Sequence, residues 1–193
     1  MLTCRVVHSS IARDVASNFA TQRSDVDDPL VRAAYAELCT QTDHIYVALT
    51  AGGGRRNYRV GFTELLMPYS SDWEMIEAVR LSHVLEVTTA TVARDRRHPL
   101  MDGASGGEYD RFRAVHDLVG HVVTGLGFDR HGEYTAWLLQ HRLHHGLARW
   151  ALATELHGEN SLLWTTGELA EHKAILLDPK LLARSRRAAS PVG

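Results

Sequence analysis

The sequence has few cysteines and no long hydrophobic run. Its two cysteines, Cys4 and Cys39, exclude a disulfide framework and favour a reducing compartment. No apolar stretch approaches the roughly 20 residues needed to cross a bilayer, and the N-terminus lacks the apolar core of a signal peptide. We therefore expect a cytoplasmic protein without a membrane partner.

An excess of charge of one sign is also absent. The chain has 21 basic and 23 acidic side chains among 193 residues, a net charge of −2, so no electrostatic footprint for nucleic acid is present. Two short arginine clusters, at 94–97 and 184–187, are typical of solvated faces or tails. The hydrophobic fraction of 45% fits a globular chain.

The apolar periodicity predicts an α+β fold, mainly helical, in a single domain over residues 1–193. Residues 1–107 supply helices and a small antiparallel sheet, and residues 108–187 form a helical metal-site region. The expected strands are 44–50, 57–65 and 83–92; the first two form a hairpin around glycines 52–54. The expected helices are 10–41, about 71–80, 108–125, 132–157, 161–176 and 179–187, with a loop at 94–107.

Histidine is the residue type in excess. Eight of the 12 histidines lie between His116 and His172. The segment FRAVHDLVGH (112–121) holds His116 and His121 five residues apart, which places them about 140° apart on an ideal α-helix. Both rings reach one cavity if the helix end is buried and Gly120 lets neighbouring backbone approach. The alternative is one structural and one exposed histidine.

A carboxylate farther along the chain completes a metal-ligand set. Glu155 lies within the apolar helix LARWALATELHGEN (147–160), where an unpaired carboxylate is costly to bury without a cation or a proton. Two histidines and one carboxylate form a facial triad that leaves positions open on Fe(II). The sequence therefore predicts His116, His121 and Glu155 as the ligands of an iron ion.

The spacing of these residues resembles the iron site of the pterin-dependent aromatic amino acid hydroxylases. That resemblance implies that His116, His121 and Glu155 hold iron, that Asp117 lies near a pterin, and that an aromatic amino acid is the substrate. It covers about 45 residues.

A second resemblance covers residues 67–177. The motifs MPYSSDWEM, HPLMDG, YDRFRAVHDLVGH, GFDRHGEYTAW, HRLHHGLARWALATELHGENS and AEHKAILL are similar to those of a poorly characterised family encoded by phages and actinobacteria. That family supplies no biochemical function. Its motifs direct attention to Arg113, Glu133, Trp137, His141, Arg142 and Asn160.

Side chains around the ligands receive roles from their spacing. Glu133, Trp137 and His141 are four residues apart and share one helix face. We expect catalytic roles for Asp117, Glu133 and His141, with His141 either as a partner that supports a metal ligand or as a proton shuttle. The expected substrate-binding residues are Arg113, Trp137, Arg142 and Asn160, and the expected tryptophan lining of the pocket is Trp137, Trp150 and Trp164.

A di-metal site is an alternative arrangement of the same residues. It would add Glu133 together with the pair Glu168 and His172, which are four residues apart, to the ligand set. The same pair is also typical of a solvated helix face. Glu171 is the alternative inward residue of that segment.

These observations predict a non-heme Fe(II), O₂-dependent oxygenase or hydroxylase that acts on a small molecule. Its partners are the substrate and O₂. One alternative is an HD-type metal-dependent phosphohydrolase, which the adjacent His116 and Asp117 favour. The other is a non-enzymatic, phage-derived structural or binding module whose buried polar network holds the core together.

Overall fold

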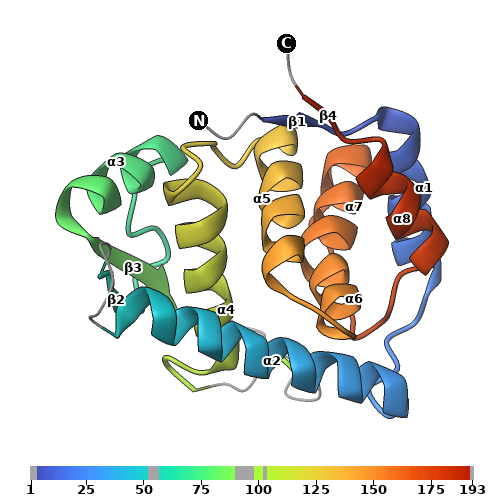
Figure 1. Cartoon of the computed structure of the whole chain (residues 1–193), viewed down its shortest axis with the longest axis horizontal. Helices are drawn as coiled ribbons and strands as arrows, with labels where there is room; N and C mark the ends of the chain where they lie inside the picture. Colours follow the sequence, from blue (N-terminus) through green and yellow to red (C-terminus); the bar gives the residue numbers. More distant parts are fainter. Residues whose placement is uncertain (1–3, 52–56, 90–97, 102–103, 192–193) are drawn as a thin grey trace.

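The computed structural model describes residues 4–51, 57–89, 98–101 and 104–191. The predicted glycine turn at 52–54, the arginine cluster at 94–97 and part of the loop at 94–107 lie outside these residues. Within them the chain is mainly helical, and packed helices form most of the molecule (Figure 1).

Helix α2 lies across one end of several other helices (Figure 1). It packs against α4 and α6, while α1 packs against α7. Helix α5 contacts two π-helical segments, η1 and η2, which continue α4 and α6. The bounds are α1 Ser9–Thr21, α2 Pro29–Thr50, α3 Asp72–Ser82, α4 Glu108–Val115, η1 His116–Val122, α5 Arg130–Leu143, α6 Ala148–Leu152, η2 Ala153–Gly158, α7 Glu159–Thr166 and α8 Pro179–Arg187.

The caps follow the local sequence. Asp28 accepts hydrogen bonds from the amides of Leu30 and Val31, and Pro29 opens α2, where its missing N–H has no partner to lose. Ser71 caps α3 and Asp178 caps α8 in the same way. The predicted starts near 71 and at 179 are therefore confirmed.

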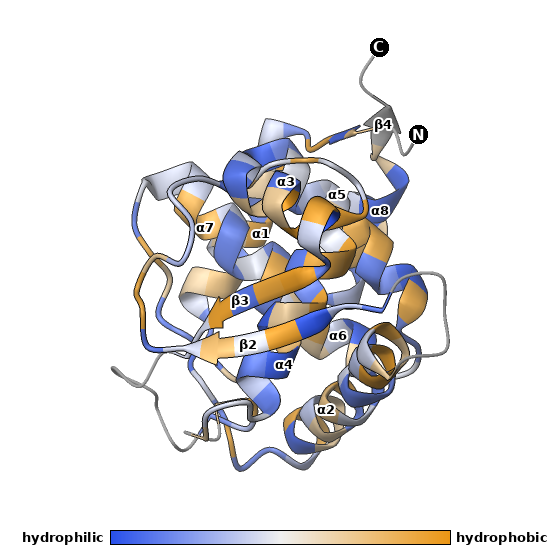
Figure 2. Cartoon of the chain, turned by 90° about the vertical axis from the view of Figure 1, so that its left-hand side faces the viewer, coloured by the Kyte–Doolittle hydropathy of each residue, from blue (hydrophilic) through white to orange (hydrophobic). Residues whose placement is uncertain are grey.

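The predicted antiparallel sheet is wrong. Strands β2 (Arg59–Thr63) and β3 (Val84–Thr88) are parallel, with Arg59 opposite Val84 and Thr63 opposite Thr88. Figure 2 shows the two strands side by side and pointing the same way. Helix α3 makes the crossover between them, because parallel neighbours need a connection of a dozen or more residues rather than a hairpin.

The predicted strand at 44–50 is also wrong, since α2 continues to Thr50. Tyr46 and Leu49, three residues apart, both pack against a buried cluster around β3 and η1. Helical spacing is what brings both side chains to that cluster. The β-branched residues of this segment therefore lie in a helix, and no hairpin forms.

The C-terminal part is less helical than expected. Helix α7 ends at Thr166, where Gly167 follows in the left-handed conformation with a φ of 78°, and residues 167–178 form no helix. The predicted helix 161–176 is wrong in this part. Strands β1 (Arg5–Val6) and β4 (Ser190–Pro191) form a short antiparallel pair.

Two hydrophobic clusters form the interior. The larger one joins α1, α2, α6 and the segment around Ile175, and the smaller one joins α3, β3 and η1. Among the described residues, no helix is both long and apolar enough to span a membrane.

Candidate metal centre

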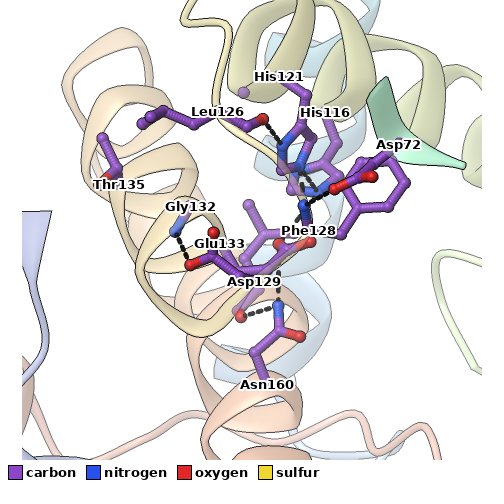
Figure 3. A network of polar contacts seen from close by, with 12 residues as sticks. Asp72, His116, His121, Leu126, Phe128, Asp129, Gly132, Glu133, Thr135 and Asn160 are labelled. Atoms are coloured by element: carbon purple, nitrogen blue, oxygen red, sulfur yellow. Dashed lines mark hydrogen bonds and ion pairs between the residues drawn. The ribbon is translucent and has the colours of Figure 1, made fainter. Parts of the chain in front are cut away.

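Three side chains with metal-ligating atoms converge from two packed elements. His116 and His121 come from η1, and Glu133 comes from the first turn of α5. The two Nε2 atoms are 3.1 Å apart; Nε2 of His116 is 3.3 Å from Oε2 of Glu133, and Nε2 of His121 is 3.5 Å from Oε1. Figure 3 shows the three side chains pointing toward one another.

The helix type explains why both imidazoles share one face. Over His116–Val122 the backbone is π-helical, and the amide of Val123 donates to the carbonyl of Leu118, five residues earlier. In a helix with this bonding pattern, residues five apart lie nearly one above the other. The expected separation of about 140° on an α-helix therefore does not apply.

Gly120 brings the third ligand close. A Cβ built on Gly120 would lie 2.7 Å from Cβ of Ala136, which is on α5. Only glycine permits this approach of η1 and α5. The same close contact carries Glu133, three residues before Ala136, to the histidines.

Each ligand has a second polar partner. Nδ1 of His121 lies 2.9 Å from the carbonyl oxygen of Leu126. This carbonyl can only accept, so Nδ1 holds the proton and Nε2 presents its lone pair to the centre. The amide of Asn160 donates to Oε2 of Glu133 at 3.2 Å and to the carbonyl of Leu156 at 2.8 Å (Figure 3). These contacts fix the directions of His121 and Glu133.

Gln140 lies behind His116. Its Nε2 is 2.9 Å from Nδ1 of His116, and its buried Oε1 has no hydrogen-bond partner among the described residues. If the side-chain amide of Gln140 is turned over, its Oε1 accepts the Nδ1–H of His116. Nε2 of His116 is then unprotonated and free to bind a metal. The orphaned oxygen therefore fits a metal-bound His116.

The pKa shifts of His116, His121 and Glu133 show how these three side chains affect one another's charge. Burial opposes charge on His116, but the facing Glu133 carboxylate outweighs it and raises the pKa of His116. Burial and the neighbouring His116 lower the pKa of His121. Although burial opposes its ionisation, the two imidazoles lower the pKa of Glu133. A carboxylate held ionised beside two imidazoles is a donor set that a divalent cation uses directly.

The spacing of the ligand atoms fits a coordination sphere. With metal–ligand bonds of about 2.1 Å, neighbouring ligand atoms are about 3.0 Å apart at right angles and about 3.4 Å apart at tetrahedral angles. The three contacts of 3.1, 3.3 and 3.5 Å lie close to this range, with each imidazole facing a different carboxylate oxygen of Glu133. Two histidines and one glutamate occupy one side of such a sphere and leave the other side open.

The open side faces a cleft of about 490 Å³. His116, Asp117 and Glu133 line it together with Arg113 and Asn160. The remaining wall is largely apolar; its apolar side chains are Leu66, Met67, Pro68, Tyr69, Met75, Val87, Phe128 and Leu163. A small molecule in this cleft would contact the ligand group directly.

The structure does not bring Glu155 to this group. Glu155 lies in a second group with Glu159 and His172, in which one ligand atom of each residue lies within 4.8 Å of the others. The Tyr35 hydroxyl donates to Glu155, and Nε2 of His98 is 3.5 Å from the same carboxylate. Glu133 takes the place that the sequence predicted for Glu155 beside the histidines.

Three further predicted residues lie at the cleft. Asp117 lines it, and burial raises the pKa of its carboxyl group. Asp117 is not one of the side chains whose ligand atoms converge with His116, so the adjacent pair does not form a joint ligand set. Arg113 lines the same cleft and donates to the carbonyl of Thr88 at 2.8 Å. Asn160 supports Glu133.

Other predicted residues lie elsewhere. Trp137 is fully buried and stacks on His157 with ring centroids 4.1 Å apart. His141 lies 3.2 Å from the guanidinium of Arg186, and burial together with that cation lowers its pKa to about 4. Arg142 is exposed. Outside the wall of the 490 Å³ cleft lie Trp150, which packs against the larger hydrophobic cluster, and Trp164, which is 45% exposed.

Of the three residues after α7 that the sequence offered as further metal ligands, one contacts a carboxylate and two are exposed. Glu168 and Glu171 are exposed, while His172 binds Glu159 through Nδ1 at 2.9 Å. Burial raises the pKa of Glu159 to about 7, although His172 opposes the shift.

Sequence reasoning missed Gln140, Glu159, His98 and Tyr35. Only Glu159 carried a usable signal, because it follows Glu155 by four residues in the same apolar stretch.

Comparisons with models of protein families, with curated proteins and with solved structures give no match. The description of the site therefore depends on its own geometry.

Proposed function

We propose that this protein is a mononuclear non-heme Fe(II), O₂-dependent oxygenase in which His116, His121 and Glu133 hold the metal. One observation carries the proposal: the ligand atoms of a 2-His-1-carboxylate set converge at coordination spacing and face a cleft. Glu133 replaces Glu155 in the ligand set that the sequence predicted.

The chain's own residues set the geometry of the site. The carbonyl of Leu126 keeps Nε2 of His121 unprotonated, and Asn160 orients the Glu133 carboxylate. Partners of this kind orient metal ligands, and their loss commonly costs 10–100-fold in metal affinity. When bound, Fe(II) would supply the electron transfer by which O₂ is reduced and a substrate is oxidised.

The cleft favours a small substrate with an apolar body and an anionic group. Apolar side chains form part of its wall, and Arg113 is the one lysine or arginine among the described lining residues, which also include the carboxylates of Asp72, Glu86, Asp117 and Glu133. A guanidinium binds a carboxylate in two-point contact, so Arg113 would orient the substrate against the metal. Asp117, whose carboxyl is buried beside His116, would hold or accept a proton at the same wall.

Metal content after anaerobic Fe(II) loading and desalting tests the centre. We expect His121→Ala and Glu133→Gln each to retain about one iron per chain less than the wild type. His145→Ala and Glu168→Gln, which change exposed residues of the same types, should retain as much iron as the wild type. Nitric oxide, an O₂ surrogate that needs no substrate, should give the EPR signal of an Fe(II)–NO adduct in the wild type.

Oxygen uptake then tests the reaction class. A panel of aromatic and aliphatic carboxylates, each with and without a reduced pterin, should include compounds that stimulate O₂ consumption in the wild type but not in Glu133→Gln. Retention of zinc alone, with hydrolysis of phosphoesters and no adduct with nitric oxide, would favour the phosphohydrolase instead. A folded wild type that retains no metal would favour the structural module.

A further inference from the structure

The second group of ligating side chains lies beside α2 and α4, with Glu155 buried and Glu159 and His172 partly exposed. Glu155 comes from η2, Glu159 from the first turn of α7, and His172 from the segment after α7. Glu155 is 5% exposed, and Nδ1 of His172 is 2.9 Å from Oε1 of Glu159. We propose that Glu155, Glu159 and His172 form a second divalent-metal site, distinct from the centre at His116, His121 and Glu133.

A buried imidazole without a partner points into this group. His98 is 3% exposed, and among the described residues its Nε2 has no hydrogen-bond partner. That atom is 3.5 Å from Oε1 of Glu155, beyond a good hydrogen bond. The Leu100 amide donates to Nδ1 at 3.3 Å, so Nε2 carries the proton of the neutral ring. A buried N–H that lies this far from the carboxylate it faces indicates a missing component beside it.

The charges of the group also lack a strong cation. Within the described ranges, neither Glu155 nor Glu159 forms an ion pair with lysine or arginine. Lys173, the residue after His172, instead donates to the carbonyls of Phe19, Ala20 and Gln22 at 3.1–3.3 Å. Glu155 is buried and Glu159 is partly buried, so the two adjacent carboxylates repel each other, and a divalent cation between them would remove the repulsion and the cost of burying charge.

The donor set indicates the class of metal. Two carboxylates and one imidazole suit Zn²⁺, Mn²⁺ or Fe²⁺ better than Ca²⁺, which prefers oxygen ligands alone. Tyr35, whose hydroxyl donates to Glu155, and His98 would stand beside the ion. Side chains of this kind hydrogen-bond to the residues that bind the metal and orient them.

The two groups are neighbours on the same elements. Along α4 and η1, Tyr109 contacts the ring of His172 with centroids 5.7 Å apart, and His116, seven residues later on the same helical face, belongs to the first group. On α7, Glu159 belongs to the second group, and the next residue, Asn160, supports Glu133. The chain thus holds two centres close together but with separate ligands.

Zinc stoichiometry tests this proposal. Chelator-stripped full-length chain, dialysed against Zn²⁺ and desalted, should retain two ions per wild-type chain by elemental analysis. We expect one ion in His172→Ala and in Glu159→Gln, one in His121→Ala, and none in a chain that combines His121→Ala with His172→Ala. Glu171→Gln, which alters an exposed carboxylate next to His172, should retain two.

Anomalous scattering from wild-type crystals grown with Zn²⁺ gives a readout that depends on no variant. A peak between Glu155, Glu159 and His172 supports the proposal, and its absence at full occupancy of the first centre overturns it. One ion per wild-type chain, unchanged in Glu159→Gln, overturns it as well. Failure of the first centre is a separate result, because it appears as unchanged stoichiometry in His121→Ala.

Discussion

Gln140 is fully buried, and its amide contacts the proposed first metal centre through His116. Replacing it with leucine keeps the volume but removes the acceptor for the Nδ1–H of His116. We expect Gln140→Leu to weaken metal binding about 10–100-fold while the three ligands remain, which is the usual effect of losing such a partner. Competition with a chelating dye measures the affinity.

Gln41→Leu is the matched control for this change. The amide of Gln41 contacts His145 at the surface, at 3.3 Å, so its loss should leave metal affinity unchanged. Equal affinities of Gln140→Leu and the wild type would contradict the role given to Gln140.

His141 illustrates how a neighbour sets the protonation of a residue. Burial, and next to it the cation of Arg186, together lower its pKa to about 4. We expect Arg186→Ala to raise the pKa of His141 toward its ordinary value of 6.5 without reaching it, because burial and Arg149 persist. NMR titration of the imidazole measures this shift, and Arg187→Ala, an exposed neighbour, should not produce it.

The sign of the associated stability change follows from the lowered pKa. The unfolded chain binds a proton at His141 near pH 6.5, whereas the folded chain binds it only near pH 4. Protonation therefore favours unfolding, and this group reduces stability as the pH falls through that window. At pH 7 the neutral imidazole of His141 also lacks the second proton, the one that an imidazolium donates as a general acid.

At the scale of elements, the contact between η1 and α5 determines whether the first centre forms. We expect Gly120→Ala to destabilise the protein by about 1–3 kcal/mol, since the added methyl group would meet Ala136 at 2.7 Å and push α5 away. Displacement of α5 carries Glu133 with it, so metal affinity should fall as well. Urea unfolding and metal titration of the same samples measure the two effects.

Gly167→Ala separates these effects. Gly167 has a φ of +78° and no atom within 4 Å of an added Cβ, so alanine there costs about 1–2 kcal/mol through backbone strain alone. It should destabilise the chain without changing metal affinity. Similar metal affinities in the two variants would refute the link between helix contact and ligand placement.

The sequence predicted the region of the site because the chemistry is local there. His116 and His121 are five residues apart, and their joint role needed only a shared face. Glu133 was assigned to catalysis because it shares a helix face with Trp137 and His141, and Glu155 was assigned to the metal because it is a carboxylate in an apolar helix. Which of them meets the histidines depends on the packing of α5 against η1, and no helical periodicity encodes that packing.

The elements of the first half were harder to predict for a related reason. Strands 59–63 and 84–88 were expected near their observed places, but their direction was wrong. A helix was expected between them, and a helix between neighbouring strands is typical of a parallel crossover. The β-branched segment 44–50 favoured a strand, and tertiary contacts of Tyr46 and Leu49 stabilise a helix instead.

At the scale of the whole molecule, metal binding should stabilise the fold. The first centre joins two elements, whereas the second joins η2, α7 and the segment after it. Zn²⁺ at 100 times its dissociation constant adds about 2.7 kcal/mol per site. We therefore expect the melting temperature of stripped protein to rise on addition of Zn²⁺, by roughly 2–4 °C per kcal/mol.

Differential scanning calorimetry of the variants measures how much each of the two sites contributes to the stabilisation by Zn²⁺. His121→Ala and His172→Ala should each lose part of the rise, and the combined variant should lose all of it. An unchanged rise in the combined variant would mean that zinc stabilises the protein through other side chains.

The π-helical segment η1 has a consequence for comparing this chain with others. Over His116–Val122 the helix accommodates one residue more than an α-helix would between two side chains on the same face. A protein with the same centre on an α-helix would space its histidines by four instead of five. An alignment that superimposes the two metal ligands therefore needs a one-residue gap between them, and a search pattern with a fixed spacing will recognise one of the two proteins and pass over the other.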